Sequence, residues 1–459
     1  MVWIEKINNR IPVALTIAGS DSSGGAGIEA DLKTFAAVGV HGTVALTSIT
    51  AQNSFGVHGV QDVDIDIVKK QIDAVVQDCG VDAAKTGMLH TSEIILAVAE
   101  KIQQYKFKVV VDPVMIAKSG APLIKPEARV SLKKEIIPLA TVVTPNKFEA
   151  EELSGVKIES TEDAKKAARA IADLGPQAVV VKGGHLEGNT CADVLYFEGD
   201  FMIYEKPRLV SNNTHGTGCC FSAAIAAYLA KGLEIPEAVK LAKNLVFEAI
   251  RHGLPVGKQF GSVNPLASLY KESEKLQILE SLENALILLN RLPKKELLMP
   301  EVRINFVYAL PEAERIEEVA AFPGRITYDG KNLRSLAFPR FGASSHMANA
   351  IITYMKYYPN VRSAINIRYD EKILNAARKI GFLISGFDRR KEPKEIREKE
   401  GATMPWGIKT ALNKVKAPAD IIFDLGGVGK EPLIKIFGEN PMDVVRKLQL
   451  ILKLINSTE

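Results

Sequence analysis

The chain has 459 residues, of which 47% are hydrophobic and 24% are charged. This length exceeds what one hydrophobic core usually serves, so we expect two domains, and the ordinary composition excludes a large disordered fraction. The net charge of +4 is too small to indicate a nucleic-acid-binding protein.

The cysteines and the apolar runs indicate the compartment. Cys79, Cys191, Cys219 and Cys220 match no zinc-binding spacing, so we interpret them as reduced thiols in a cytoplasmic protein. No apolar run approaches the roughly 18 residues of a membrane-spanning helix, and no N-terminal segment pairs a basic region with an apolar core. We therefore expect neither membrane insertion nor secretion.

Strands and helices are predicted to alternate through the first half of the chain. This alternation is typical of a parallel sheet with helices on both faces. Because the carboxyl ends of parallel strands meet at one edge, the polar residues that follow each strand should line a single crevice. The predicted strands are Val13–Ala18, Thr43–Ile49, Asp82–Thr86, Phe107–Val111, Thr141–Val143 and Ala178–Val181, and the predicted helices include Asp64–Asp78 and Ser92–Gln104.

A glycine-rich loop at 212–221 precedes an apolar run with helical spacing and predicts a helix N-terminus that faces a ligand. Gly216 and Gly218 let the backbone approach that ligand, and the first-turn N–H groups favour an anion. Cys219 lies on this first turn, where the positive end of the helix should lower the pKa of its thiol. The alternative is a buried and inert cysteine.

Four further side chains of the predicted crevice suggest chemistry. Asp112 and Glu149 carry carboxylate oxygens suited to a hydrated magnesium ion, and Lys182 is placed to meet a phosphate. Gln52 carries a donor and an acceptor on one amide, which matches an aminopyrimidine edge. The alternatives are a helix cap or surface carboxylate, and for the glutamine a buried amide that bonds to backbone.

These segments together resemble the hydroxymethylpyrimidine/phosphomethylpyrimidine kinases of thiamine biosynthesis over residues 11–265. The loop after the first strand carries neither the dinucleotide fingerprint nor the Walker P-loop. The resemblance implies an α/β class protein whose first domain has the ribokinase-like α/β/α fold and a mainly parallel sheet. Cys219 stands where sugar kinases carry aspartate. The matching segments are Thr16–Gly27, Ala51–Asn53, Lys85–Leu89, Thr144–Asn146, Lys182–His185 and Thr214–Cys219.

The resemblance also implies roles for individual residues. Gly19, Gln52 and Met88 would bind the pyrimidine, and Cys219 would be catalytic, either as a base or by orienting the hydroxyl group. The adjacent Cys220 leaves open which thiol faces the substrate. The residues implied to bind ATP or its phosphates are Asn146, Lys182, Thr214, Gly216, Thr217 and Gly218, and those implied to hold Mg²⁺ are Asp112 and Glu149.

The alternation of strands and helices stops after Pro265, and a second domain is predicted. Leucines spaced by three and four mark an amphipathic helix from about Ala267 to Leu292. We divide the chain into a kinase domain at 1–266, a connector at 267–279 and a second α/β domain at 280–459. The predicted strands of this domain are Ile304–Tyr308, Ser335–Phe338, Ser363–Ile367, Leu383–Ser385 and Asp420–Phe423, and its predicted helices are Ser345–Tyr357, Glu371–Ile380, Pro405–Val415 and Pro441–Leu454.

The loops of the second domain are rich in cationic and glycine residues. Arginine forks and helix-start amides suit phosphate, so we expect an anionic, phosphorylated ligand. A single arginine would more often be solvated surface, and a lone histidine would more often be structural. The candidates are Arg325, Arg340, His346, Arg389, Gly427 and Lys430.

Residues 280–459 resemble the archaeal-type thiamine-phosphate synthase domain, which often follows the same kinase. The resemblance implies an α/β/α fold related to the class II aldolase-like sheet, and the coupling of the pyrimidine diphosphate to a thiazole phosphate. Arg325, Arg340 and His346 would then be catalytic and bind pyrophosphate as it leaves. The matching segments are Phe338–Gly342, Gly386–Arg389 and Asp424–Pro432.

The expected protein is a bifunctional enzyme of thiamine biosynthesis that uses ATP and Mg²⁺. Its expected small-molecule partners are hydroxymethylpyrimidine, ATP and thiazole phosphate, and we expect a homo-oligomer, a dimer, that binds neither nucleic acid nor membrane. Two alternatives stay open. The second domain could be a sensor of thiamine phosphate that regulates the kinase, since the same domain occurs in such sensors, or the kinase could act on another ring, such as pyridoxal.

Overall fold

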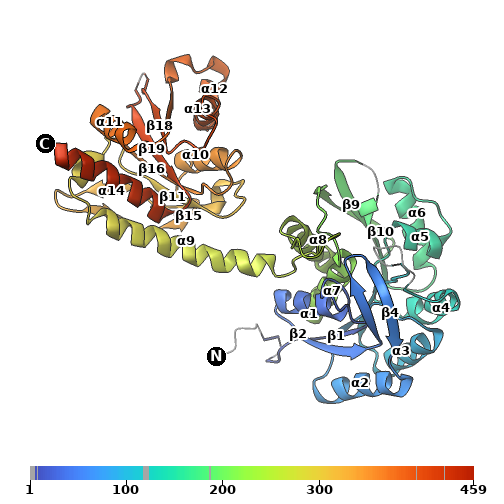
Figure 1. The fold of residues 1–459 in the computed structure, drawn as a ribbon. Coiled ribbons are helices and arrows are strands. Elements are labelled where there is room, and N and C mark those ends of the chain that lie inside the picture. The colour runs from blue at the N-terminus through green and yellow to red at the C-terminus, as the bar shows by residue number, and fades with distance from the viewer. Residues whose placement is uncertain are drawn as a thin grey trace. The chain divides into compact units, whose positions relative to one another are not determined.

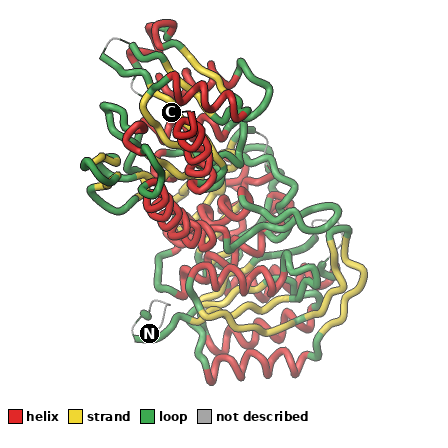
Figure 2. The backbone as a smooth tube through the Cα atoms, turned by 60° about the vertical axis from the view of Figure 1, so that its left-hand side comes forward, coloured by secondary structure: helices red, strands yellow, loops and turns green. Residues whose placement is uncertain are grey.

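The chain divides into two compact units, residues 1–270 and 271–459, in a computed structural model that describes residues 6–7, 9–116, 123–185, 188–399, 401–427 and 429–458. Each unit has a central sheet with helices on both faces (Figure 1, Figure 2). Among the described residues, no helix is long and apolar enough to cross a membrane.

The first unit is built on an eight-stranded sheet in the order β10-β9-β8-β7-β6-β5-β1-β2. Neighbours from β2 to β8 pair in parallel, whereas β9 and β10 pair antiparallel at one edge. The mainly parallel sheet is therefore as predicted. Its strands are β1 (Val13–Ala18), β2 (His41–Leu46), β5 (Ala83–Thr86), β6 (Lys108–Val111), β7 (Val142–Val143), β8 (Ala178–Val181), β9 (Thr190–Phe197) and β10 (Asp200–Pro207).

Side chains that alternate along the strands pack into two separate hydrophobic cores, one on each face of this sheet. Leu15 and Val111 pack with one set of helices, whereas Ala14 and Val110 pack with the other. Both faces are apolar because both are covered, as expected for a parallel sheet. The first set is α2 (Ile65–Asp78), α3 (Ser92–Tyr105), α4 (Pro126–Ser131), α5 (Lys147–Ser154) and α6 (Thr161–Ala172), and the second is α1 (Gly27–Val38), α7 (Thr217–Ala230) and α8 (Ile235–Arg251).

The predicted strand Thr43–Ile49 was wrong in one respect. The strand β2 ends before Thr47, whose N–H donates to Ala18 O and whose hydroxyl donates to Met88 O. A new strand, β3 (Ser48–Asn53), then pairs antiparallel with β4 (Gly56–Asp62) in a separate hairpin. Gln52 therefore lies within a strand rather than in a loop after one.

The second unit has a seven-stranded sheet in the order β15-β12-β11-β16-β19-β18-β17. Only β17 and β18 pair in parallel among its described strands. The predicted strand Ser335–Phe338 was wrong, because β13 (Ile326–Tyr328) and β14 (Leu333–Ser335) form a hairpin that ends where that strand should begin. The sheet strands are β11 (Phe306–Ala309), β12 (Val319–Ala321), β15 (Arg340–Phe341), β16 (Ser363–Arg368), β17 (Ile384–Phe387), β18 (Ile421–Asp424) and β19 (Leu433–Gly438).

Helices cover both faces of this second sheet, so the unit has three layers. One core joins the sheet to α9, α11 and α14, and the other joins it to α10 and α13. The helix predicted from the leucine spacing is α9, which buries Ile278, Leu282 and Leu289 in the second unit. The helices are α9 (Ala267–Leu289), α10 (His346–Met355), α11 (Glu371–Ile380), α12 (Lys394–Glu398), α13 (Thr403–Leu412) and α14 (Pro441–Thr458).

Candidate functional site

The N-terminus of α7 lies near Asp112 and Lys182, which follow the carboxyl ends of the parallel strands β6 and β8. Gly216 caps the helix with a φ of 82°, and a Cβ at this position would lie 1.8 Å from Gly25 O. Only glycine fits there, because a side chain would meet backbone. The hydroxyl of Thr217 donates to Thr214 O at 2.7 Å and closes the preceding turn.

Lys182 and Asp112 lie directly in front of this helix start. Lys182 Nζ is 3.1 Å from Asp112 Oδ1, and a Cβ on Gly218 would lie 3.4 Å from the same Nζ and 3.5 Å from Asp112 Oδ2. Ser222 Oγ donates to Asp112 Oδ2 at 3.3 Å. A cation, a carboxylate and a glycine turn thus meet at one point.

Glu149 is the second carboxylate of this group. Its Oε2 accepts the N–H of Asn146 at 2.7 Å, and Asn146 Oδ1 accepts the N–H of Glu149, so the two residues form the capping box of α5. Burial and the charge of Asp112 raise the pKa of Glu149 and the charge of Lys182 lowers it, which together give a value of about 7. Glu149 therefore interacts electrostatically with both Lys182 and Asp112.

Cys219 and Cys220 occupy different environments. Cys220 is fully buried in the core under α1, whereas the half-buried Cys219 interacts electrostatically with Lys85 and Asp112. Burial raises the pKa of the Cys219 thiol to about 11, and Lys85 lowers it only in part. The expectation that the helix start would favour a thiolate is therefore wrong for the free protein, because the cost of desolvating the anion is larger.

Lys85 lies in one of the segments that carry the resemblance, but it was not predicted as a site residue. It lies on β5, is fully buried, and its Nζ is 2.8 Å and 3.1 Å from the two carboxylate oxygens of Asp31. Thr16 Oγ1 donates to the same carboxylate at 2.7 Å. Burial lowers the pKa of Lys85, but the charge of Asp31 outweighs it and keeps the lysine protonated. A lysine inside an apolar strand was the signal that could have revealed this pair.

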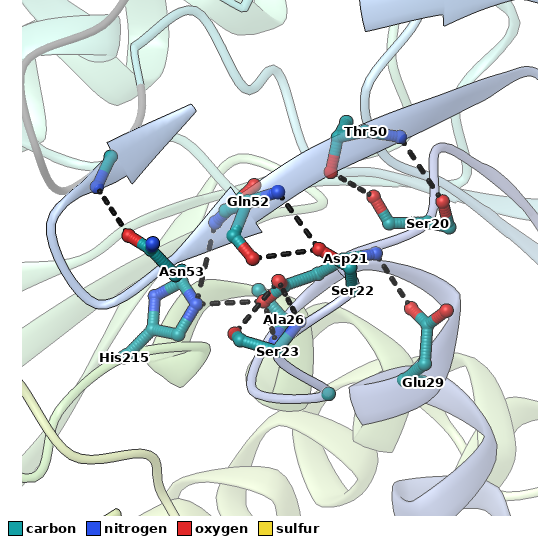
Figure 3. A network of polar contacts seen from close by, with 12 residues as sticks. Ser20, Asp21, Ser22, Ser23, Ala26, Glu29, Thr50, Gln52, Asn53 and His215 are labelled. Carbon is teal, nitrogen blue, oxygen red and sulfur yellow. Dashed lines mark hydrogen bonds and ion pairs between the residues drawn. The ribbon is translucent and has the colours of Figure 1, made fainter. Parts of the chain in front are cut away.

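A polar network links the loop after β1 to the loop before α7 (Figure 3). His215 Nε2 is 2.8 Å from Asp21 Oδ2 and 3.4 Å from Gln52 Nε2. Burial raises the pKa of Asp21, but hydrogen bonds from His215 and Ser23 lower it to about 2. Asp21 and His215 were not predicted, although both lie within the segments that carried the resemblance.

The three residues predicted to bind the pyrimidine lie in two neighbouring places. A Cβ on Gly19 would lie 3.3 Å from Met88 Sδ, so these two residues are in contact. The amide of Gln52 instead faces His215 (Figure 3). The backbone N–H of Gln52 donates to Ser22 Oγ at 2.8 Å, which ties β3 to the loop after β1.

The second unit has a pocket of about 450 Å³ at the N-terminus of α10. Arg325 and His346 line it, whereas Arg340 lies exposed on β15 and is not among the lining residues. Arg325 has a φ of 68°, and its guanidinium donates to Val302 O. The pocket is lined by Glu301, Val302, Arg303, Asn305, Gly324, Arg325, Ala343, Ser344, Ser345 and His346.

A buried charged cluster lies beside this pocket. Asp424 accepts from Arg389 Nε at 2.8 Å and from Lys435 Nζ at 2.6 Å. Burial, together with the charges of Lys435 and Arg389, lowers the pKa of His346 to about 4. His346 is therefore a neutral imidazole at neutral pH in the free protein.

The other predicted phosphate ligands of the second unit are divided between core and surface. Arg389, a predicted phosphate ligand, is buried and bonded to Asp424, so the alternative of a solvated surface arginine is wrong. Gly427 and Lys430 are exposed and close a tight turn through reciprocal backbone hydrogen bonds of 2.9 Å. The structure thus brings Arg325 and His346 together and leaves Arg340, Gly427 and Lys430 outside the pocket lining.

Two families match the two units. The family described as phosphomethylpyrimidine kinase matches residues 21–264, and the family described as thiamine-phosphate synthase ThiN matches residues 281–450.

Similar proteins and structures match the first unit. The hydroxymethylpyrimidine/phosphomethylpyrimidine kinase of Bacillus subtilis is 48% identical over 256 residues, which are 55% of this chain and 94% of the relative. The thiamine biosynthesis bifunctional protein ThiED of Geobacter sulfurreducens is 48% identical over 262 residues, 56% of this chain but 54% of that protein. An ADP complex of Bacillus subtilis pyridoxal kinase superposes with a TM-score of 0.54 at 43% identity, covering 56% of this chain and 99% of that one. The pyridoxal kinase of Staphylococcus aureus in complex with AMP-PCP and pyridoxal gives a TM-score of 0.53 at 41% identity, covering 56% of this chain and 94% of that one.

The geometry and these matches agree on the first unit. The unit that contains this sheet, the glycine-capped α7 and the Lys182–Asp112 pair superposes on pyridoxal kinases solved with ADP and with AMP-PCP and pyridoxal. The second unit adds the synthase match over a separate three-layer domain. The chain therefore belongs to the phosphomethylpyrimidine kinase family, with ribokinase-like architecture, and carries a thiamine-phosphate synthase ThiN domain behind the kinase.

Proposed function

We propose that the first unit phosphorylates 4-amino-5-hydroxymethyl-2-methylpyrimidine twice and that the second unit joins the resulting diphosphate to thiazole phosphate. The products of the second step are thiamine phosphate and pyrophosphate. The observation that carries the kinase assignment is the meeting of Lys182, Asp112 and Gly218 at the start of α7. Phosphoryl transfer depends mainly on positioning and on charge stabilisation, which this group supplies.

In this proposal, ATP lies with its phosphates between Lys182 and the first turn of α7. Lys182 offers the point charge, and the turn at Gly216 to Gly218 offers backbone N–H groups that converge on an anion. Asp112 and Glu149 are the carboxylates that would hold the magnesium ion carried by ATP, since Mg²⁺ takes few protein ligands beside phosphates and waters. Asn146 fixes Glu149 through the capping box.

Cys219 faces the phosphoryl acceptor as a thiol in this proposal. With a pKa of about 11, it is protonated before the substrates bind, so its first role is to orient the hydroxyl group of the pyrimidine. Lys85 stabilises negative charge that develops near Cys219 during transfer, because its own charge is fixed by Asp31. Gly19, Met88 and the amide of Gln52 hold the pyrimidine ring.

In the second unit, pyrophosphate leaves toward Arg325 and the N-terminus of α10. A leaving diphosphate develops negative charge, and an arginine beside helix-start amides stabilises it. His346 is neutral in the free pocket, and an adjacent anion raises the pKa of an imidazole. The imidazole is thus placed to hold a proton beside the pyrophosphate once it has formed.

Incubation of the chain with hydroxymethylpyrimidine, Mg-ATP and thiazole phosphate tests the proposal. Chromatography should show the monophosphate, the diphosphate and then thiamine phosphate. Lys182→Met should abolish the diphosphate yet leave synthesis from supplied pyrimidine diphosphate intact. Arg325→Ala should accumulate the diphosphate, because the two reactions use separate units.

Two alternative activities are decided by the same incubation. A wild-type chain that stops at the diphosphate and binds thiamine phosphate tightly would support a sensor role for the second unit. Pyridoxal is the other candidate substrate, because two pyridoxal kinases of known structure are 41–43% identical to this chain over the first unit. Turnover of pyridoxal at a kcat/KM equal to that of the pyrimidine would contradict a dedicated pyrimidine kinase.

A further inference from the structure

Glu431 holds a backbone segment that lines the pocket of the second unit. Its Oε2 accepts the N–H of Glu301 and its Oε1 accepts the N–H of Val302, each at 2.9 Å. Both N–H groups belong to the centre of a turn, which the N–H of Arg303 closes on Pro300 O at 3.0 Å. One carboxylate thus clamps two consecutive N–H groups of a segment that lies 130 residues earlier in the chain.

A glycine allows the chain to present Glu431 at this point. Gly426 has a φ of 71°, and a Cβ there would lie 2.6 Å from Lys430 O and 2.8 Å from Pro432 N. Any side chain at this position would meet backbone, so only glycine lets the chain on either side of Glu431 pack against it. The N–H of Gly426 donates to the buried Asp424 Oδ1 at 3.1 Å, which anchors it to the end of β18. The backbone that carries Glu431 is therefore held in one place.

The clamped segment also bonds to Arg325. The guanidinium of Arg325 donates to Val302 O, and the N–H of the same Val302 is held by Glu431. Two backbone hydrogen bonds between Ile304 and Ile326, of 3.1 and 2.8 Å, join the chain beside Arg325 to the same segment. A single residue, Val302, thus connects the carboxylate to the guanidinium. A guanidinium has five N–H groups, so this bond leaves others for a ligand.

The clamp lies outside the pocket lining, whereas the group that it holds lies inside. Glu301, Val302 and Arg325 line the pocket, and the half-buried Glu431 is not among the lining residues. Arg325 is exposed, and an arginine side chain carries about 2 kcal/mol of rotamer entropy that is lost when a ligand fixes it. The bond to Val302 O restricts the guanidinium before a ligand arrives, provided that this carbonyl group stays in place.

We propose that Glu431 is a positioning residue of the second unit, because its clamp on the backbone holds the carbonyl group to which the guanidinium of Arg325 is bonded. The proposal rests on the proposed synthase function, in which Arg325 receives the leaving pyrophosphate. Glu431 touches no substrate and acts through Val302 alone. Misplacement of a catalytic group by about 1 Å can slow a reaction about 10²-fold, so a small shift of this carbonyl group is sufficient.

The test is a double-mutant cycle between Glu431→Gln and Arg325→Ala, with thiamine phosphate formation as the readout. Glutamine has the size of glutamate but only one acceptor oxygen, so it cannot hold both N–H groups in the same geometry. Alone, Glu431→Gln should lower kcat at least about tenfold. In the Arg325→Ala background it should change the residual kcat less than about twofold, because the side chain through which Glu431 acts is absent.

Asp329→Asn is the matched control. Asp329 Oδ1 also accepts two consecutive backbone N–H groups, from Lys331 at 2.9 Å and from Asn332 at 2.7 Å, but Asp329 does not line the pocket. This variant should leave kcat unchanged. Calorimetry with inorganic pyrophosphate gives a second readout, in which Glu431→Gln should raise the dissociation constant and Asp329→Asn should not.

The outcomes separate a positioning role from a merely structural one. A structural role would slow the reaction by the same factor in both backgrounds, and that result, or an unchanged kcat in Glu431→Gln, would overturn the assignment of Glu431 while the synthase proposal stands. All variants are compared below the unfolding temperature of the least stable one. If Glu431→Gln does not fold, the cycle is run with Glu431→Asp, which keeps the charge on a shorter side chain.

Failure of the synthase proposal is read separately. A wild-type chain that binds pyrophosphate without forming thiamine phosphate would refute the synthase, and the cycle would then be read from the dissociation constants of pyrophosphate. A wild-type chain that neither turns over nor binds pyrophosphate would overturn both proposals.

Discussion

The buried pair of Lys85 and Asp31 gives the sharpest prediction about the kinase unit. Both side chains have no exposed surface, and their closest N–O distance is 2.8 Å. Lys85→Met would leave the carboxylate of Asp31 buried with Thr16 as its remaining side-chain hydrogen-bond donor. Breaking one side of a buried ion pair typically costs about 3–5 kcal/mol, because the remaining charge is desolvated and uncompensated.

The double variant Lys85→Met/Asp31→Leu distinguishes the cost of leaving one charge unpaired from a general loss of packing at these two positions. Replacing both charges by apolar side chains is often neutral or stabilising, so the double variant should regain most of the stability that either single variant loses. The interaction energy from the double-mutant cycle should be on the order of 3 kcal/mol. Although stable, the double variant should phosphorylate the pyrimidine more slowly than wild type, because it lacks the charge of Lys85 that lowers the pKa of Cys219.

Differential scanning calorimetry measures this prediction. The transition of the kinase unit is identified as the one that AMP-PCP shifts upward, since a ligand stabilises the unit that binds it. For a unit of this size, a loss of 3–5 kcal/mol corresponds to a fall in Tm on the order of 10 °C. A Lys85→Met protein as stable as wild type, or a double variant as unstable as the single one, would refute the reasoning.

Three further predictions concern single side chains. Cys219→Ala should lower kcat for the pyrimidine by roughly 10²–10⁴-fold in steady-state assays if the thiol assists the proton transfer, with the KM for ATP unchanged. Gln52→Leu should raise the KM for the pyrimidine by an amount equivalent to about 1–3 kcal/mol, and weaker ATP binding instead would contradict it. Because the pKa of His346 is lowered in the folded state, its contribution to stability is present above pH 6.5 and is lost as the pH falls toward 4. Over this pH range, the free energy of unfolding measured in urea should therefore fall less for His346→Gln than for wild type, by up to about 3 kcal/mol.

Local sequence signals predicted the elements that are self-contained. The strand Val13–Ala18 and the helix Glu371–Ile380 have the predicted bounds, the first from a β-branched run and the second because Asp370 caps its start and Gly381 ends it with a φ of 90°. β19, at Leu433–Gly438, was missed because its apolar run is interrupted by Lys435. That lysine is tolerated in a buried strand only because Asp424, from β18, pairs with it.

In the candidate sites too, features set by neighbouring residues in the sequence could be predicted, and features set by distant residues could not. The glycine turn before α7 and the carboxylates at strand ends could be predicted, since each follows from residue type and position. The acid–base state of Cys219 and His346 could not, because it depends on burial and on charges that lie far away in the sequence. Lys85 and Asp31 are 54 residues apart, and His346 is governed by Lys435 and Arg389.

Both units solve one electrostatic problem in the same way. In each unit, a fully buried lysine on a sheet strand is bonded to a carboxylate: Lys85 to Asp31 in the first unit and Lys435 to Asp424 in the second. Each lysine lies on the face of the sheet that packs against the helix at the candidate site, which is α7 in the first unit and α10 in the second. A lysine exposed in the crevice would be screened by water and could move away. Buried and paired, it adds a fixed positive potential to that of the helix start.

This potential has a consequence for catalysis that differs between the two sites. At Cys219, the charge of Lys85 lowers the pKa of the thiol, whereas the charges of Asp31 and Asp112 raise it. At His346, the charges of Lys435 and Arg389 add to burial in lowering the pKa below its ordinary value. In the free protein, the thiol therefore stays protonated, with a pKa of about 11, and the imidazole stays neutral. Under the proposed function, a bound phosphate would offset the positive charge around the imidazole. Under the proposed function, we therefore expect the buried lysine of the kinase unit to stabilise an oxyanion, and the imidazole of the second unit to take up a proton when pyrophosphate is present.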